Sequence, residues 1–316
     1  MIIPILIYLV PLAGFGAAPT VRGTLTEHSL AASSALQAPA EGSARQETQR
    51  EVTFYHGNGA KAREGLLVDG RREGHWRGWH ANGKPAWAGG FSGYRRTGTW
   101  LFYDEQGERE SSGDFVNGTR SGAWTSWYPD GKRKSVVAWE AGNRSGPVSF
   151  WAAGGEKEKE GFKTFGIKTG AWIQYHQNGE KLSEGEYALG KKNGSWTRYY
   201  ATGTREWEGP FVDDKEQGLW TRWFANGQLE AVGSYEKGGQ TGLWVGYHKN
   251  GQKRYEGELF GPNRIGPWVF WHQNGQKQSE GEFVAGKREG PWRGWTRAGD
   301  DDQEFSGIYL GGERVQ

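Results

Sequence analysis

The chain has 316 residues, among them 53 glycines, 18 tryptophans, 13 tyrosines and 14 phenylalanines. Its 39 basic and 37 acidic residues nearly cancel, which excludes the strong positive field of a nucleic-acid-binding protein. No cysteine is present, which excludes disulfides, thiolate catalysis, cysteine-based zinc sites and a lipid anchor on cysteine.

The first 50 residues differ in composition from the rest of the chain. An apolar run from Ile2 to Ala18 ends in small residues and resembles the core and cleavage region of a bacterial signal peptide. We therefore expect residues 1–18 to direct export, to the periplasm or outside the cell. No Lys or Arg precedes the run and two prolines interrupt it, so a membrane anchor or a cytoplasmic location stays open. Residues 19–50, rich in Ala, Ser and Gln, are predicted to be a disordered linker, and residues 51–316 to hold the ordered structure.

A Gly-x-Trp motif returns every 24 residues through the ordered part. Its tryptophans form what we call the first column: Trp76, Trp100, Trp124, Trp172, Trp196, Trp220, Trp244, Trp268 and Trp292, with Val148 in the one place where the tryptophan is missing. Such a fixed period predicts an array of one small unit, because a single unit cannot bury its own apolar surface and must stack on its neighbours. A function is then expected on a repeated surface.

Each unit is predicted to be a β-hairpin. In one of them, Ala171–His176 reads as a first strand, Asn178-Gly179 as a type I′ turn, Lys181–Ala188 as the returning strand and Leu189–Asn193 as the link to the next hairpin. Ten such units predict an all-β protein: an elongated, single-layer antiparallel meander of about 20 strands, roughly 100 Å long at the usual strand spacing. Glycines in the returning strands, such as Gly185, are expected to leave room for facing rings or to permit bulges.

Two further aromatic columns share the 24-residue period. The second column follows the first by three residues and comprises Trp79, Tyr103, Trp127, Trp151, Tyr175, Tyr199, Trp223, Tyr247, Trp271 and Trp295. Because side chains alternate faces along a strand, this offset places the first two columns on opposite sides of the sheet. The third column lies in the returning strands, at Phe91, Phe115, Trp139, Tyr187, Phe211, Tyr235 and Phe283, where its rings are expected to fill the gaps between hairpins.

The pattern G-x-W-x-x-Y-x-x-N-G-x-x-x-x-E-G-x-Y-x-x-G-K occurs nearly whole at Gly170–Lys191 and again at Gly266–Lys287. It resembles the MORN-repeat variant, and the likeness spans about Val52 to Gly312. The resemblance implies single-layer antiparallel hairpins and a non-catalytic role in binding or scaffolding. Many bacterial members resemble the YwqK antitoxin family, which implies an antitoxin-like inhibitor of a cognate toxin as one form of that role.

No constellation in the sequence predicts chemistry. Five histidines occupy one repeat position, but equivalent atoms in adjacent repeats should lie roughly 10 Å apart, too far to ligate one metal ion. We interpret them as half-buried planar fillers: His56, His80, His176, His248 and His272. Carboxylates such as Glu184 recur at one phase and read as a solvated row rather than a convergent acid–base pair. We therefore expect no catalytic residue, no cofactor and no metal, and no enzyme.

The candidate binding surface combines tryptophans with a basic row that is predicted to lie in the loops between hairpins. Its residues are Trp220, Trp244 and Trp268 with Arg72, Arg96, Arg120, Arg264 and Arg288. The leading hypothesis is a scaffold that binds a protein partner. The alternatives are an exported binder of carbohydrate or cell wall that uses the aromatic ladder, and a binder of phospholipid membrane surfaces that uses the basic row. The basic row can also be a solvated row offset by nearby carboxylates.

The repeat ends near an acidic insertion, Asp300–Asp302, which delays the last glycine markers by two residues. A final strand is predicted near 304–310, and the insertion is interpreted as a cap. Charges beside a terminal strand discourage edge-to-edge pairing, so we expect a monomer. A tight dimer in sedimentation would contradict that expectation.

Overall fold

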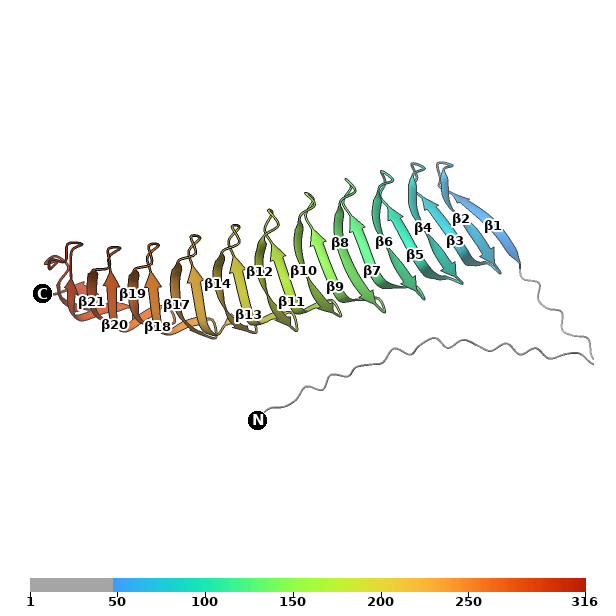
Figure 1. Cartoon of the computed structure of the whole chain (residues 1–316). Helices are drawn as coiled ribbons and strands as arrows, with labels where there is room; N and C mark the ends of the chain where they lie inside the picture. The colour runs from blue at the N-terminus through green and yellow to red at the C-terminus, as the bar shows by residue number, and fades with distance from the viewer. Residues whose placement is uncertain (1–47) are drawn as a thin grey trace, which may run out of the picture. The chain divides into compact units, whose positions relative to one another are not determined.

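The computed structural model describes residues 48–316, which form a single row of β-hairpins (Figure 1). Each strand pairs antiparallel with its neighbours in chain order, and β15 and β16 act as one strand interrupted at Gln217. The predicted all-β, single-layer meander is therefore confirmed. Among residues 48–316, no helix is long and apolar enough to cross a membrane. The predictions for residues 1–18, and for the linker up to residue 47, lie outside the described residues.

The array begins at Gln49, two residues before the predicted start, and holds more strands than predicted because the C-terminal cap and one interruption add to the hairpins. The strands are β1 (Gln49–Tyr55), β2 (Lys61–Val68), β3 (Arg71–Trp79), β4 (Pro85–Ser92), β5 (Arg95–Tyr103), β6 (Arg109–Val116), β7 (Thr119–Trp127), β8 (Arg133–Glu140), β9 (Asn143–Trp151), β10 (Lys157–Thr164), β11 (Ile167–Tyr175), β12 (Lys181–Ala188), β13 (Lys191–Tyr199), β14 (Arg205–Val212), β15 (Lys215–Glu216), β16 (Gly218–Trp223), β17 (Leu229–Glu236), β18 (Gly239–Tyr247), β19 (Lys253–Phe260), β20 (Asn263–Trp271), β21 (Lys277–Val284), β22 (Lys287–Gly294), β23 (Gly307–Leu310) and β24 (Glu313–Arg314).

The turns at the Asn-Gly pairs are not type I′. In the turn after β11, Gly179 N donates to the carbonyl of His176 at 3.0 Å, and Gly179 has φ 86° while Asn178 keeps a negative φ. This is a type I turn followed by a left-handed glycine. Asn178 is used instead for its side chain, which donates from Nδ2 to the Ala201 carbonyl of the next turn at 2.7 Å. The same bond joins successive turns at Asn58, Asn82, Asn178, Asn226, Asn250 and Asn274.

Type I′ turns occur between the hairpins, at the opposite edge of the sheet. Leu189 and Gly190 both have positive φ, 50° and 85°, and they alone link β12 to β13. The predicted five-residue link is too long, because Lys191–Asn193 already belong to β13. Gly194, with φ 71°, does not start that strand but lies in a bulge inside it, where the register passes from Glu184 opposite Thr197 to Glu186 opposite Asn193.

Each first-column tryptophan packs flat on a glycine of the returning strand before it. Trp196 is 1% exposed, and a Cβ added to Gly185 would collide with its indole ring. The indole Nε1 donates to the Glu186 carbonyl at 3.0 Å, at the bulge where Glu186 begins the next run of pairing. All nine tryptophans of the column make the equivalent bond to the carbonyl ten residues earlier. The expected role of the returning-strand glycines is therefore confirmed.

One repeat solves the same packing problem with different residues. Val148 replaces the tryptophan, and Val137 replaces the glycine that would lie beneath it. The two valines are directly paired between β8 and β9, and they are 2% and 9% exposed. Because two medium side chains fill the space of one large ring over a bare Cα, the volume is kept and the core remains closed.

The core is a string of aromatic rings along one face of the sheet, which we call the inner face. Third-column rings stand edge-on between successive tryptophans: Tyr187 meets Trp196 at 5.1 Å and 88°, and Trp196 meets Phe211 at 6.3 Å and 84°. Edge-to-face packing is the favoured geometry for such rings. The prediction that the third column fills the gaps between hairpins is confirmed.

The C-terminal cap closes this string. Phe305 and Tyr309 pack against Trp292 with ring centroids 6.1 and 6.4 Å away. The strand predicted near 304–310 is β23, which begins at Gly307 because the preceding residues form a turn in which Asp302 accepts backbone bonds from Phe305 and Ser306. A further short strand, β24, pairs with it and ends the sheet. The last tryptophan of the array thus receives the cover that a further repeat would otherwise provide.

Candidate functional site

The tryptophans of the candidate surface lie in the core. Trp220 is 6% exposed, and Trp244 and Trp268 are each 2% exposed. Their indole rings are packed between strand glycines and third-column rings on the inner face, so the flat face of each ring is not open to a ligand such as a sugar.

The basic row covers tryptophans of the first column, among them Trp268 but not Trp220 or Trp244. The guanidinium of Arg120 lies 4.0 Å from the centroid of Trp124, the closest such contact in the row. The other candidate arginines lie 4.6–5.1 Å from their tryptophans: Arg72 over Trp76, Arg96 over Trp100, Arg264 over Trp268 and Arg288 over Trp292. The prediction that this row lies in loops is wrong, because each of these arginines is the second residue of a strand. Burial over the rings lowers the pKa of Arg120, and cation–π contact offsets part of that desolvation.

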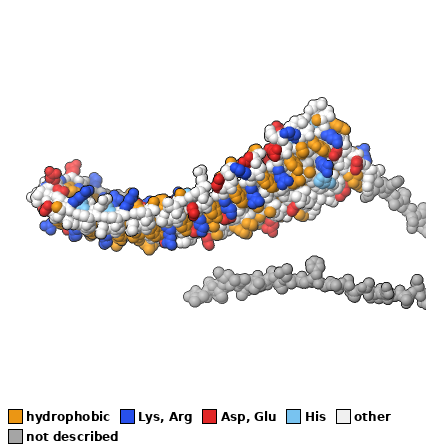
Figure 2. Space-filling model, turned by 45° about the horizontal axis from the view of Figure 1, so that its top comes forward, with side chains coloured by type: hydrophobic (Ala, Val, Ile, Leu, Met, Phe, Trp, Pro, Cys, Tyr) orange, Lys and Arg blue, Asp and Glu red, His pale blue; other side chains and the backbone are white. Residues whose placement is uncertain are grey.

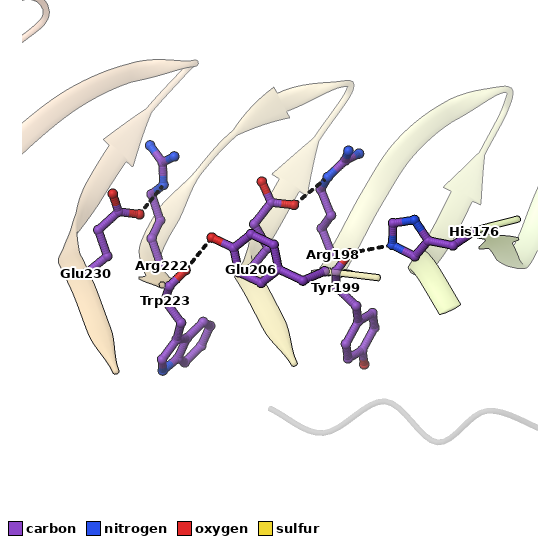
Figure 3. A network of polar contacts seen from close by, with 8 residues as sticks. His176, Arg198, Tyr199, Glu206, Arg222, Trp223 and Glu230 are labelled. Atoms are coloured by element: carbon purple, nitrogen blue, oxygen red, sulfur yellow. Dashed lines mark hydrogen bonds and ion pairs between the residues drawn. The ribbon is translucent and has the colours of Figure 1, made fainter. Parts of the chain in front are cut away.

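The histidine row joins neighbouring repeats. His176 shares a hydrogen bond through Nε2 with the Tyr199 carbonyl at 2.9 Å, and in the next repeat the Tyr200 hydroxyl donates to the Trp223 carbonyl at 2.9 Å (Figure 3). All five histidines make the same link: His56, His80, His176, His248 and His272. Within residues 48–316, no group of three or more His, Cys, Asp or Glu side chains could hold a metal ion. The sequence indicated this link by placing His in some repeats and Tyr in others at the same position. Both side chains are planar and can form a hydrogen bond at the far end of the ring.

Replacing His176 tests this link. His176→Phe keeps a planar ring but removes the bond to the Tyr199 carbonyl, and we expect it to lower the free energy of unfolding by about 1 kcal/mol. His176→Tyr is the matched control, because a tyrosine makes the bond in the following repeat and should leave stability unchanged. Equal losses in both variants, measured by urea denaturation, would show that ring shape and not the hydrogen bond matters.

The face opposite the first column, the outer face, carries the second aromatic column. Tyr199 and Trp223 point to one side of the sheet while Arg198 and Arg222 point to the other (Figure 3), as the three-residue offset predicted. The second-column rings are half-buried. Beside them runs a row of ion pairs: Lys181 meets Glu184 at 2.7 Å, and Glu184 accepts from the Tyr199 hydroxyl at 2.6 Å. The preceding repeat presents the same ring, cation and carboxylate, with Tyr175, Lys157 and Glu160.

Two tyrosines of this row, Tyr175 and Tyr199, should ionise at a pH above the usual value of 10. Burial and a hydrogen bond to Glu160 raise the pKa of Tyr175 to about 12, and burial and Glu184 do the same for Tyr199. Because the native pKa lies above the unfolded value of 10, these groups stabilise the fold below pH 10, and that contribution is lost as the pH rises toward 12. We expect stability to fall across this window, less so in the Tyr175→Phe/Tyr199→Phe variant. Ultraviolet titration in which all tyrosines ionise near pH 10 would contradict this.

Large apolar side chains are exposed on the outer face and at the turns between hairpins. Leu219 and Leu243 each precede a buried tryptophan in their strand and therefore point to the outer face, where they are 62% and 56% exposed. Together with residues at or near the inter-hairpin turns they form what we call the apolar stripe: Val116, Phe162, Phe165, Ile167, Leu189, Val212, Leu219, Leu243, Phe260 and Val284. Figure 2 shows hydrophobic side chains along the array with Lys and Arg between them. Sequence reasoning missed the stripe because its members are spread over several repeat positions: Val116, Val212, Phe260 and Val284 share one, Leu219 and Leu243 a second, and Phe165 and Leu189 a third.

Comparison with known proteins identifies the repeats. The family model described as MORN repeat variant matches residues 168–188, 216–237 and 264–285. No curated protein matches the chain. Among solved structures, the crystal structure of TcdB2-TccC3-TEV is 11% identical with a TM-score of 0.19, over 83% of this chain and 16% of that one. TcdB2-TccC3 without its hypervariable C-terminal region is 9% identical with a TM-score of 0.18, over 84% and 18%.

The chain thus spans less than a fifth of those solved chains, and similarity this low carries no argument about function. The repeat period, the paired hairpins and the three matched segments agree with one another. The chain thus contains MORN variant repeats at residues 168–188, 216–237 and 264–285.

Proposed function

We propose that the protein is a non-catalytic scaffold that binds a protein partner along its outer face. The observation that carries the proposal is the apolar stripe, because soluble monomers rarely expose large apolar side chains in groups unless a partner covers them. The inner face is occupied by its own tryptophans and the cations over them. An antitoxin-like inhibitor that covers a cognate toxin would be one form of this scaffold.

The arrangement of polar groups supports a non-catalytic role. Groups that could transfer protons, such as Glu184 and His176, engage their own neighbours in repeated bonds. Catalysis instead requires unlike groups that converge on one reacting atom. A long face with equivalent groups at each step favours contact with an extended partner.

Affinity capture with outer-face variants tests the scaffold. The immobilised full chain is incubated with lysate of its source cell beside a Leu219→Ser/Leu243→Ser variant, which removes two exposed apolar groups of the stripe. Tyr55→Ser/Val315→Ser is the matched control, since both residues are exposed and lie outside the stripe. We expect one protein at a 1:1 ratio with the wild type and the control, and its loss with the stripe variant. Retention by all three would place the interface elsewhere.

A glycan is the second candidate ligand, favoured by a surface hollow on the outer face. Tyr199, Thr204, Arg205 and Trp223 line this hollow between successive second-column rings. Rings in adjacent repeats lie roughly two strand spacings apart, about 10 Å, which suits a linear polymer of stacked sugars. Co-sedimentation with cell-wall polysaccharide that is lost in Tyr199→Ala/Trp223→Ala, with no captured protein, would favour the glycan over the scaffold.

A further inference from the structure

Two adjacent inter-hairpin turns have a composition that folding does not explain. The first residue of these turns takes φ near 50°, which suits Asn and Asp, and Asp69, Asn117 and Asp213 occupy three of them, while Ala141, Lys237 and Ala285 occupy others. Phe165 and Leu189 take the same conformation, at φ 49° and 50°, although bulky side chains are disfavoured there. They are also 73% and 89% exposed. Backbone strain and exposed apolar surface both oppose stability, a combination found where a site serves a ligand.

The two turns lie side by side and share apolar neighbours. Gly190 N donates to the Lys168 carbonyl at 3.0 Å, which joins one turn to the preceding hairpin. A Cβ on Gly190 would lie 3.2 Å from Cγ2 of Ile167, so that side chain reaches across to the next turn. The turn patch, as we name it, comprises the exposed side chains of Phe162, Phe165, Ile167 and Leu189.

Basic residues lie in and beside the turn patch, and three of them, Arg144, Lys168 and Lys192, extend over core rings of the inner face, 5.4, 4.7 and 4.5 Å from Trp139, Trp172 and Trp196. The basic residues in and beside the two turns are Arg144, Lys163, Lys168, Lys191 and Lys192, and within residues 48–316 none of the five forms an ion pair with a carboxylate. Burial, and then repulsion by Arg144 and Lys168, lowers the pKa of Lys163. Burial lowers the pKa of Lys168 and Lys192, and the nearby Asp214, together with Glu216 in the case of Lys192, opposes this shift. The two turns therefore combine exposed apolar side chains with basic side chains that form no direct ion pair with a carboxylate of residues 48–316.

We propose that the turn patch binds a short segment of a protein partner that carries Asp or Glu beside Leu or Phe. This inference rests on the proposed scaffold function and names the chemistry of its partner. Apolar side chains of the segment would cover Phe165 and Leu189, while its carboxylates would pair with Lys163 and Lys191 at the rim, the usual division of an interface into apolar centre and charged border.

A flat anionic membrane fits this site less well than a peptide. The turns on either side of the patch carry exposed carboxylates: Glu140 ends β8 before it, and Asp213 and Asp214 form the turn after it. A membrane lying on this edge would meet these carboxylates and be repelled. A short peptide contacts only the patch and avoids them.

Selection from a displayed library of random short peptides tests the proposal on the full chain. The variant Phe165→Asn/Leu189→Asn removes both apolar tips and, like Asn117, suits the turn conformation, so its Tm should equal or exceed that of the wild type. Peptides selected by the wild type are expected to be rich in Asp, Glu, Leu and Phe. Their Kd for this variant should be roughly 10- to 30-fold weaker. Lys163→Gln/Lys191→Gln should weaken binding and reduce its salt dependence.

Three results would overturn the inference: selected peptides that are neutral or basic, selected peptides that bind the Asn variant equally well, or loss on mutation of binding to phosphatidylserine vesicles and not to peptides. The Leu219→Ser/Leu243→Ser variant separates this inference from the function on which it rests. If that variant loses the captured protein while peptides ignore Phe165 and Leu189, the scaffold stands and only the turn patch is wrong.

Discussion

Replacing Gly185 with alanine is expected to lower the free energy of unfolding by about 3 kcal/mol, a large effect for one methyl group. The added Cβ would overlap the indole of Trp196, which is packed between Tyr187 and Phe211 and bonded through Nε1 to a backbone carbonyl. The ring cannot move away without breaking these contacts. Chemical denaturation measures the loss.

Gly57→Ala is the matched control for this prediction. Gly57 has a negative φ and open space where a Cβ would lie, so alanine should be tolerated there with a change within about 0.5 kcal/mol. If Gly185→Ala were equally mild, the account of tryptophans packed on bare backbone would be wrong.

Replacing the Val137–Val148 pair with the glycine–tryptophan pair of the other repeats should restore their packing in this repeat. Val148→Trp alone places an indole against Val137, and we expect a loss of about 3 kcal/mol or more. Val137→Gly alone leaves a cavity and should lose about 2 kcal/mol. In the double variant Val137→Gly/Val148→Trp the indole can lie on glycine as it does in nine other repeats, so stability should return close to that of the wild type.

The double-mutant cycle measures this compensation directly. We expect a coupling free energy of at least about 2 kcal/mol between positions 137 and 148. The indole at position 148 needs the space that glycine leaves at position 137, and the cavity left by glycine needs the indole to fill it. Additive losses would mean that the two valines are not a substitute for the tryptophan–glycine pair and that their neighbours decide the packing of this repeat.

Periodicity made most of the fold predictable. The period predicted the hairpins, and the three-residue offset between Trp196 and Tyr199 predicted opposite faces, because alternation along a strand is fixed by backbone geometry. The turn types were not predictable from Asn-Gly alone. Asn178 is required by its bond to the next turn, a contact between residues 23 positions apart, and the left-handed position at Leu189 carries no glycine to reveal it.

The site was predictable only in part. Tryptophan abundance placed Trp220 and Trp244 among the candidate ligand-binding residues, but a single-layer sheet has few other side chains with which to build a core, so they are buried. The basic row was found correctly as a row, yet Arg264 lies in a strand and over the Trp268 ring, because only two residues link β19 to β20. Phe165 and Leu189 occupy a repeat position that other repeats fill with small or polar residues such as Asn117 and Asp213, so a search for features common to all repeats passes over them.

Footprinting of the full chain by carbene labelling, with and without the captured partner, tests the central claim most directly. The account predicts that bound partner protects the outer face and inter-hairpin turns, above all Leu189, Leu219 and Leu243, while the Asn-Gly turns, represented by Asn178, label equally in both states. Protection confined to the Asn-Gly turns or to the arginines of the inner face, with Leu219 and Leu243 still labelled, would contradict it.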